Sequence, residues 1–162
     1  MADPTTLALL LGRLSRLNEA VVNEICSDNA TTPAEVRVMS LLSHRPDRSA
    51  SPSDIASFVV QTSGGLTATL RRLETDGLVE RRPDPTDGRG KLVVLTDTGV
   101  AFHDRMIETL AGRIERVLTA LDLEETDRVV RALVEAFEHD GGLPSSAGFQ
   151  AGVPVPTSPT PT

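Results

Sequence analysis

Apolar residues recur every three or four positions over three long stretches of the chain, which is the period of an amphipathic α-helix. The first stretch lies within residues 5–29, and the other two lie within residues 100–140. Their apolar stripes together exceed the surface that one small domain can cover. We therefore expect a partner set of helices to bury the excess.

Short helices with clear start signals follow the first stretch. Thr32 can cap a helix that begins at Pro33, and Glu35 completes a capping box. Ser51 can cap the next helix in the same way, because Pro52 occupies its first helical position. A third helix follows this one after a tight turn, so the pattern predicts a helix-turn-helix.

The third helix and a β-hairpin are expected within residues 61–98. The apolar stripe of this helix is formed by Leu66, Leu70 and Leu73. Gly77 is expected to end it. Residues 78–82 and 91–95 have the composition of two strands, and the polar loop between them predicts a hairpin. Thr96 can then cap the helix that follows.

The third helix begins with unusually small residues. Gly64 and Gly65 stand in its first turn, where each glycine costs about 1 kcal/mol relative to alanine. Glycine is useful there if another backbone must approach closely, because it has no side chain to clash. DNA is the partner that we expect to approach this helix.

Three motifs in a fixed order carry a resemblance to a known family. They are Leu73-Glu74-Thr75-Asp76-Gly77-Leu78-Val79-Glu80-Arg81, Asp87-Gly88-Arg89 and Leu95-Thr96-Asp97-Thr98-Gly99. Their order and spacing are similar to the winged helix-turn-helix core of the MarR family of transcription regulators. The resemblance implies a mostly α (α+β) fold: a winged helix-turn-helix lobe with a β-hairpin wing, plus long N- and C-terminal dimerisation helices.

The resemblance extends less specifically over most of the chain and suggests its division. Residues 1–140 are expected to form the winged-helix domain, with dimerisation helices at 5–29 and 100–140 and a DNA-binding lobe at 32–98. Residues 141–162 are rich in Pro, Ser and Thr, and such a segment cannot bury enough apolar surface to order itself. We predict a disordered tail there.

The resemblance implies a regulator, with repression as the expected mode, that binds double-stranded DNA as a homodimer on a pseudo-palindromic operator. Members of the family commonly release DNA when a small aromatic ligand binds, so a small-molecule effector is a candidate partner. Hydroxyls at helix starts are expected on phosphates: Ser51, Ser53, Thr62 and Ser63. The candidates for major-groove edges are Gln61, Thr67, Ala68, Thr69, Arg71 and Arg72, and Gly64 is expected at the DNA on the same helix.

Helix geometry narrows the candidates for base contacts. Positions 64, 67, 68 and 71 share one face, which favours Thr67, Ala68 and Arg71 for base edges and leaves Arg72 for phosphate. The alternative is a solvated face on which both arginines pair with Glu74 or Asp76.

The hairpin loop resembles the wing of the family. In that family the wing-tip arginine, here Arg89, enters the minor groove, where narrow DNA concentrates negative potential. Asp87 is expected to accept from a nearby arginine and brace the loop, since a carboxylate beside DNA is otherwise unfavourable. Lys91 is expected to contact phosphate.

Charge distribution agrees with this reading although the net charge is −7. Residues 36–91 hold nine Arg and Lys against seven Asp and Glu, whereas the rest holds seven against sixteen. A local basic excess matters more for phosphate contact than total charge does. No run of about 18 apolar residues is present, so no membrane span is expected, and the cytoplasm is the expected location.

Other chemistry has weaker support in the sequence. Cys26 is the single cysteine, and a redox-sensing regulator acting through it is an alternative to an inert buried thiol. His44, His103 and His139 have no metal-ligand spacing and are expected at the surface or near helix ends, so no metal or cofactor is expected. No catalytic motif is present, so we expect no enzyme. A winged-helix module that binds protein is the other alternative.

Overall fold

A computed structural model describes residues 3–59, 63–85, 87 and 90–140. Within this part of the chain the elements follow in the order α1 (Pro4–Asp28), α2 (Pro33–Ser43), β1 (Ser49–Ala50), α3 (Pro52–Val59), α4 (Ser63–Thr75), β2 (Val79–Pro83), β3 (Lys91–Leu95), α5 (Asp97–Leu118) and α6 (Leu123–Asp140). The mostly α fold class with a small antiparallel sheet is therefore confirmed.

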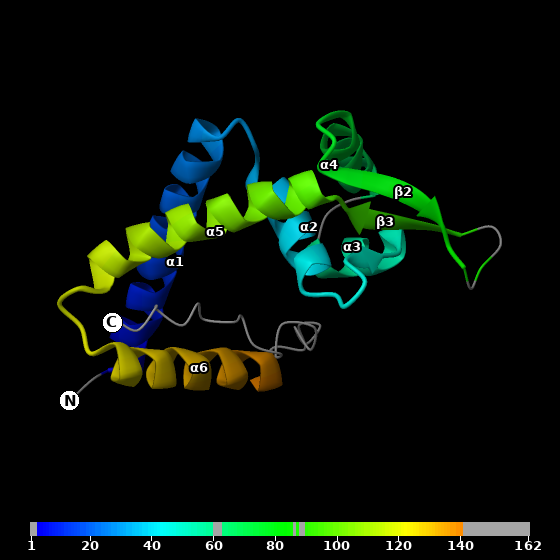
Figure 1. Ribbon diagram of the computed structural model, residues 1–162. Coiled ribbons are helices and arrows are strands. Elements are labelled where there is room, and N and C mark those ends of the chain that lie inside the picture. The colour runs from blue at the N-terminus through cyan, green and yellow to red at the C-terminus, as the bar shows by residue number, and fades with distance from the viewer. Residues whose placement is uncertain (1–2, 60–62, 86, 88–89, 141–162) are drawn as a thin grey trace, which may run out of the picture.

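The elements form two regions that α5 joins (Figure 1). On one side, α2, α3 and α4 pack with the small sheet into a lobe, and the β2–β3 hairpin extends from it. On the other side, α1 and α5 lie against each other, and α6 follows after a turn. Because α5 starts beside the sheet and ends beside α1, a rotation of α5 would move the lobe relative to the other long helices.

The helix starts depend on local capping, as expected from the sequence. Thr32 accepts from the backbone N–H of Glu35, whose carboxylate accepts from the Thr32 N–H in return. Ser51 Oγ accepts from the Asp54 N–H at 3.1 Å at the start of α3. Thr96 accepts from the Gly99 N–H at 3.0 Å at the start of α5. Each cap satisfies a backbone donor that the first turn of a helix cannot satisfy itself.

The lobe has one apolar core. It is built of Val38, Met39, Leu41, Leu42, Ala50, Ile55, Val59, Leu66, Leu70, Leu73, Leu78, Val79, Val93 and Leu95. These residues come from all three helices and all three strands of the lobe, so the position of each element depends on the others. The core is aliphatic, as the scarcity of aromatic residues requires.

The sheet has the order β1-β3-β2, with both pairings antiparallel. The hairpin of β2 and β3 is confirmed, with Val79 opposite Leu95 and Pro83 opposite Lys91. The strand β1 was not predicted. Its two residues are too few to show a periodic pattern, and they become a strand only by pairing with Val93 and Val94 of β3.

The long helices expose apolar side chains that the single chain does not cover. The large exposed hydrophobic residues are Leu7, Leu9, Leu10, Leu14, Leu17, Val117, Leu121, Leu123, Val129, Val130, Leu133, Val134 and Phe137. All of them lie in α1, at the end of α5, in α6 or in the turn before α6, and none of those identified lies in the described part of the lobe. The excess apolar surface expected from the sequence is therefore present.

The expected domain boundaries remain predictions, and the tail predicted at 141–162 lies outside the described residues. Among the helices that the structure describes, none combines the length and the apolar character needed to cross a membrane.

Candidate nucleic-acid interface

The end of α4 is held by a Schellman motif. Gly77 has φ of +68°, its N–H donates to the Glu74 carbonyl at 3.1 Å, and the Leu78 N–H donates to the Leu73 carbonyl at 2.9 Å. Glycine takes this left-handed conformation without the steric cost that a Cβ brings. Leu73 and Leu78 are both buried, so the motif also ties the end of the helix to the core of the lobe.

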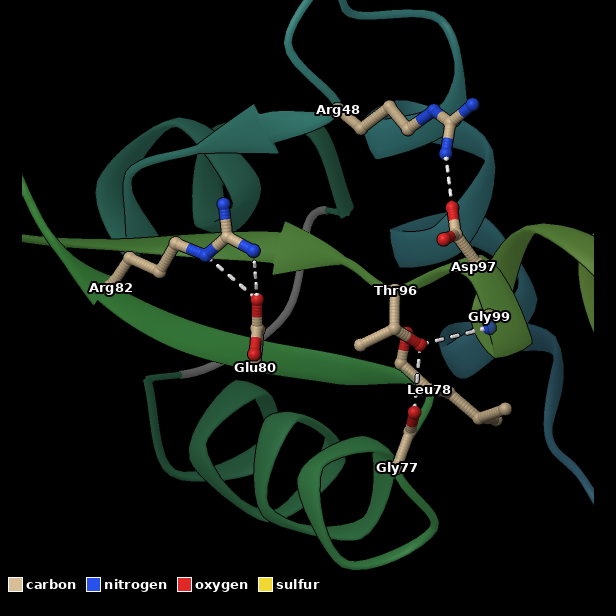
Figure 2. A network of polar contacts seen from close by, with 8 residues as sticks. All are labelled: Arg48, Gly77, Leu78, Glu80, Arg82, Thr96, Asp97 and Gly99. Carbon is tan, nitrogen blue, oxygen red and sulfur yellow. Dashed lines mark hydrogen bonds and ion pairs between the residues drawn. The ribbon is translucent and has the colours of Figure 1, made fainter.

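The same end of α4 is fastened to the start of α5 (Figure 2). Thr96 Oγ1 lies 2.7 Å from the Gly77 carbonyl oxygen and 3.1 Å from the Leu78 carbonyl oxygen, so one hydroxyl proton serves both acceptors. The Thr96 N–H also donates to the Leu78 carbonyl at 3.1 Å. A Cβ on Gly99 would lie 2.1 Å from the Leu78 carbonyl oxygen, so only glycine allows α5 to approach this closely.

The face of α4 that points away from the core of the lobe presents mostly small, exposed residues. Gly64, Thr67, Ala68 and Arg71 are all exposed, as expected for the favoured base-contacting face. A Cβ placed on Gly64 would meet nothing within 4 Å, so packing within the protein does not require glycine there. The Arg71 side chain makes no ion pair with any described residue, and Glu74 pairs with Arg81 of β2 at 2.9 Å. This face is available to a partner.

Two of the predicted DNA contacts are placed differently. Thr69 is 9% exposed, and its hydroxyl donates to the Gly65 carbonyl at 3.0 Å, so the prediction that it faces the groove is wrong. It lies on the apolar stripe of α4, three residues after Leu66. Arg72 was expected on phosphate or paired with Glu74 or Asp76, but its Nε lies 3.0 Å from Oε1 of Glu35 in α2.

The start of α3 presents the two serines that were expected on phosphate. Ser53 is exposed and Ser51 is half-buried, and their hydroxyl oxygens lie 2.7 Å apart. Because Ser51 already accepts from the Asp54 N–H, the pair forms a small hydroxyl cluster at the positive end of the helix. Such a cluster can donate to an anion.

Two charged pairs lie near the base of the hairpin. Arg82 donates to Glu80 within β2 at 2.7 Å, and Arg48, just before β1, donates to Asp97 at the start of α5 at 2.9 Å (Figure 2). Near the tip, the Gly90 N–H donates to the Asp87 carbonyl at 2.9 Å. Lys91 is exposed at the first position of β3.

Several predicted contacts fall outside the described residues. These are Gln61, Thr62 and Arg89, together with the side chain of Ser63, which begins α4. The bracing of the loop by Asp87, through a nearby arginine, therefore stays a prediction.

The other candidate chemistry is buried between α1, α2 and α5. Cys26 is 2% exposed, and burial raises the pKa of its thiol, which disfavours the reactive thiolate. His103 is also buried, with Nε2 2.9 Å from Ser40 Oγ, so its expected place at the surface or a helix end is wrong. Burial lowers the pKa of His103. No cluster of metal-binding side chains occurs among the residues that the structure describes.

Comparisons with known proteins agree with this geometry. The family model described as MarR family matches residues 31–90. The uncharacterized HTH-type transcriptional regulator YkoM of Bacillus subtilis is 30% identical over 116 residues, which cover 72% of this chain and 74% of YkoM. The multiple antibiotic resistance protein MarR of Escherichia coli is 31% identical over 113 residues, covering 70% of this chain and 77% of that protein.

A solved structure shows the same fold. The crystal structure of Sco3205, a MarR family transcriptional regulator from Streptomyces coelicolor in complex with DNA, aligns with a TM-score of 0.72 over 90% of this chain and 91% of that chain, at 22% identity. The helix-turn-helix with its wing, the matching family model and the identity to MarR converge on one conclusion. This chain belongs to the MarR family of winged helix-turn-helix transcriptional regulators.

Proposed function

We propose that the chain is a homodimeric repressor that binds a pseudo-palindromic operator in double-stranded DNA, with α4 of each protomer in the major groove. The observation that carries this proposal is the exposed face of α4. It combines small residues, an arginine with no ion pair to the described residues, and a glycine at position 64 that internal packing does not require. A groove can accept such a face closely.

The exposed apolar stripes support the dimer. Leu10, Leu14 and Leu17 on α1 and Leu133 and Val134 on α6 are between 37% and 60% exposed in the single chain. A two-fold partner would bury these stripes and set a fixed distance between the two copies of α4. Two recognition helices about one helical turn of DNA apart require an operator with matching half-sites.

Each candidate residue has a distinct role in the proposal. Thr67 and Ala68 offer methyl groups to thymine, and Arg71 can pair with guanine. The Ser51 and Ser53 hydroxyls position the protein on phosphates. Arg89 and Lys91 on the wing supply the remaining basic contacts.

The test is a binding titration with DNA from upstream of the gene of this chain, repeated over a series of salt concentrations. Arg71→Gln should weaken specific binding by about 1–3 kcal/mol and relax preference at one position of each half-site. Arg116→Gln, at an exposed position of α5 far along the chain from the lobe, is the matched control and should leave affinity unchanged. If Arg71→Gln kept both the affinity and the sequence preference of the wild-type chain, the proposal would be contradicted.

Release by a small aromatic ligand is the second part of the proposal. The apolar cavity beside Cys26, lined by Val22, Met106 and Leu110 among others, has a volume of only about 20 Å³. Benzene needs a cavity on the order of 150 Å³. This cavity is therefore too small for an aromatic effector, which would need another site. A thermal-shift screen of small aromatic acids and phenols, followed by DNA release, would test this; no shift with any of them would contradict release by this ligand class.

A further inference from the structure

The Glu35 carboxylate is buried and uses both oxygens. Glu35 is 3% exposed. Its Oε2 accepts from the Thr32 N–H at 2.8 Å and from Thr31 Oγ1 at 3.0 Å, while its Oε1 lies 3.0 Å from Nε of Arg72. The capping box needs only the first oxygen. The second is directed at α4.

This contact joins three parts of the chain at one side chain. Thr31 belongs to the turn after α1, Glu35 to the first turn of α2, and Arg72 to the C-terminal half of α4. Among the described residues, no other ion pair links α4 to α2. A carboxylate this buried is costly if it loses its charged partner, so the pair favours one orientation of Arg72.

The rotation of α4 about its own axis decides where its exposed face, with Thr67, Ala68 and Arg71, meets the DNA. The apolar contacts of Leu66, Leu70 and Leu73 hold α4 on the core, but apolar packing is not directional. With an outer radius of about 5–6 Å, a rotation of ~10° moves an exposed side chain by ~1 Å. A shift of that size is enough to misalign a hydrogen bond to a base edge.

We propose that Glu35 is a positioning residue for DNA recognition. It holds Arg72 and thereby fixes the rotation of α4, so that Arg72 serves as a structural anchor and not as a phosphate ligand. The inference rests on the proposed DNA-binding function. Its carboxylate also connects Thr31, in the turn after α1, to the recognition helix.

The test uses Glu35→Gln, Arg72→Gln and the double variant in the full chain. Glutamine keeps the size of Glu35 and its capping oxygen but removes the charge. We expect each single variant to lose about tenfold in specific affinity and the double variant to lose no more than either. Non-specific affinity and the slope of binding against salt should stay at the wild-type level, because no phosphate contact is removed.

Two controls separate positioning from other roles. Glu74→Gln removes a carboxylate of α4 itself, which pairs with Arg81 of β2 at a partly exposed site, and should change specific affinity less than twofold. Thermal melts, with binding measured well below each midpoint, separate a loss of orientation from a loss of folded protein. Should Glu35→Gln fail to fold, Arg72→Gln alone still distinguishes a positioning role from a phosphate contact. Arg72 is about half exposed, so its substitution should leave the chain folded.

The opposite result is equally clear. If Arg72 holds a phosphate, Arg72→Gln lowers specific and non-specific affinity together and reduces the salt slope by about one, while Glu35→Gln leaves affinity unchanged or raises it. That outcome overturns the positioning role and leaves the proposed function intact. A wild-type chain that binds no DNA at low salt would instead overturn the proposed function, and this inference with it.

Discussion

At the scale of single residues, Gly99 decides how closely α5 can approach the recognition helix. A Cβ there would lie 2.1 Å from the Leu78 carbonyl oxygen and 2.7 Å from Leu95 Cδ1. Because a backbone carbonyl cannot rotate away as a side chain can, Gly99→Ala must push α5 from the lobe. We expect a loss of about 1–3 kcal/mol or more in the free energy of unfolding, measured by urea titration.

Gly112 provides the matched control for this prediction. It lies in the same helix, and a Cβ there would meet nothing within 4 Å. Gly112→Ala should therefore stabilise the protein by up to about 1 kcal/mol through helix propensity. Equal effects of the two substitutions would show that the close contact at Gly99 is not important.

His103 makes a second prediction at this scale, on pH. Its imidazole is buried, and burial lowers its pKa below the ordinary value of 6.5 despite the attraction of Asp104, whose carboxylate lies 3.5 Å away and is mostly exposed. His44 lowers the pKa further. Among the residues that the structure describes, the ring Nδ1 has no hydrogen-bond partner, so the contact with Asp104 is weak.

The unfolded chain therefore binds a proton at His103 more readily than the folded chain does. The contribution of neutral His103 to the free energy of unfolding is fully present above pH 6.5. It falls as the pH drops from there towards the lower folded-state pKa, by up to about 1.4 kcal/mol per pH unit. Urea unfolding at about pH 7.5 and about pH 5.5 checks this, with His103→Gln as the reference. A wild-type slope no steeper than that of His103→Gln would contradict the prediction.

At the scale of elements, the N-cap of α5 does more than start a helix. Thr96 Oγ1 accepts from the Gly99 N–H and donates towards the carbonyl oxygens of Gly77 and Leu78, which lie in the motif that ends α4. Thr96→Val keeps the shape of the side chain but removes all three contacts. We expect a loss of about 1–2 kcal/mol in stability by chemical denaturation.

The control for Thr96 is Thr109→Val in the same helix. The Thr109 hydroxyl is exposed and donates only to the Arg105 carbonyl within its own helix at 2.8 Å. Its loss should change stability by less than about 0.5 kcal/mol. A cost as large at Thr109 as at Thr96 would mean that helix propensity, and not the connection to α4, explains the result.

Elements whose signals are local could be predicted, and those that depend on distant partners could not. The caps at Thr32 and Thr96 and the stop at Gly77 act within a few residues, so sequence patterns reveal them. The strand β1 exists only through its pairing with β3, some 45 positions along the chain. No local pattern records such a partner.

The same distinction applies to the candidate site. Periodicity correctly placed Thr67, Ala68 and Arg71 on the exposed face of α4. It would also have excluded Thr69, since that residue falls with Leu66 and Leu70 on the apolar stripe. By contrast, Arg72 meets a carboxylate from α2, and the capping box already gave Glu35 a sufficient local role, so nothing in the sequence signalled the second one.

At the scale of the whole molecule, the single chain leaves the apolar stripes of its long helices uncovered. Apart from the half-buried Thr126, every residue of α6 whose exposure is described is exposed, although the helix has a strong apolar stripe. An isolated amphipathic helix gains little by exposing such a stripe to water. The lobe, in contrast, has a closed core of its own. In the proposed dimer the partner would therefore cover the long helices and not the lobe, and the distance between the two lobes would depend on it.

Leu133→Glu tests this dependence. A charge in the middle of the α6 stripe cannot be buried without a partner for it, so the variant should sediment as a monomer under conditions in which the wild-type chain sediments as a dimer. Specific DNA binding should fall much more than non-specific binding, because the two half-sites can no longer be read together. Arg128→Glu, about half a turn away from the stripe, also places a glutamate on α6 and should remain a dimer. A monomeric wild-type chain at micromolar concentration would remove the dimer from the mechanism, and with it the reason for a pseudo-palindromic operator.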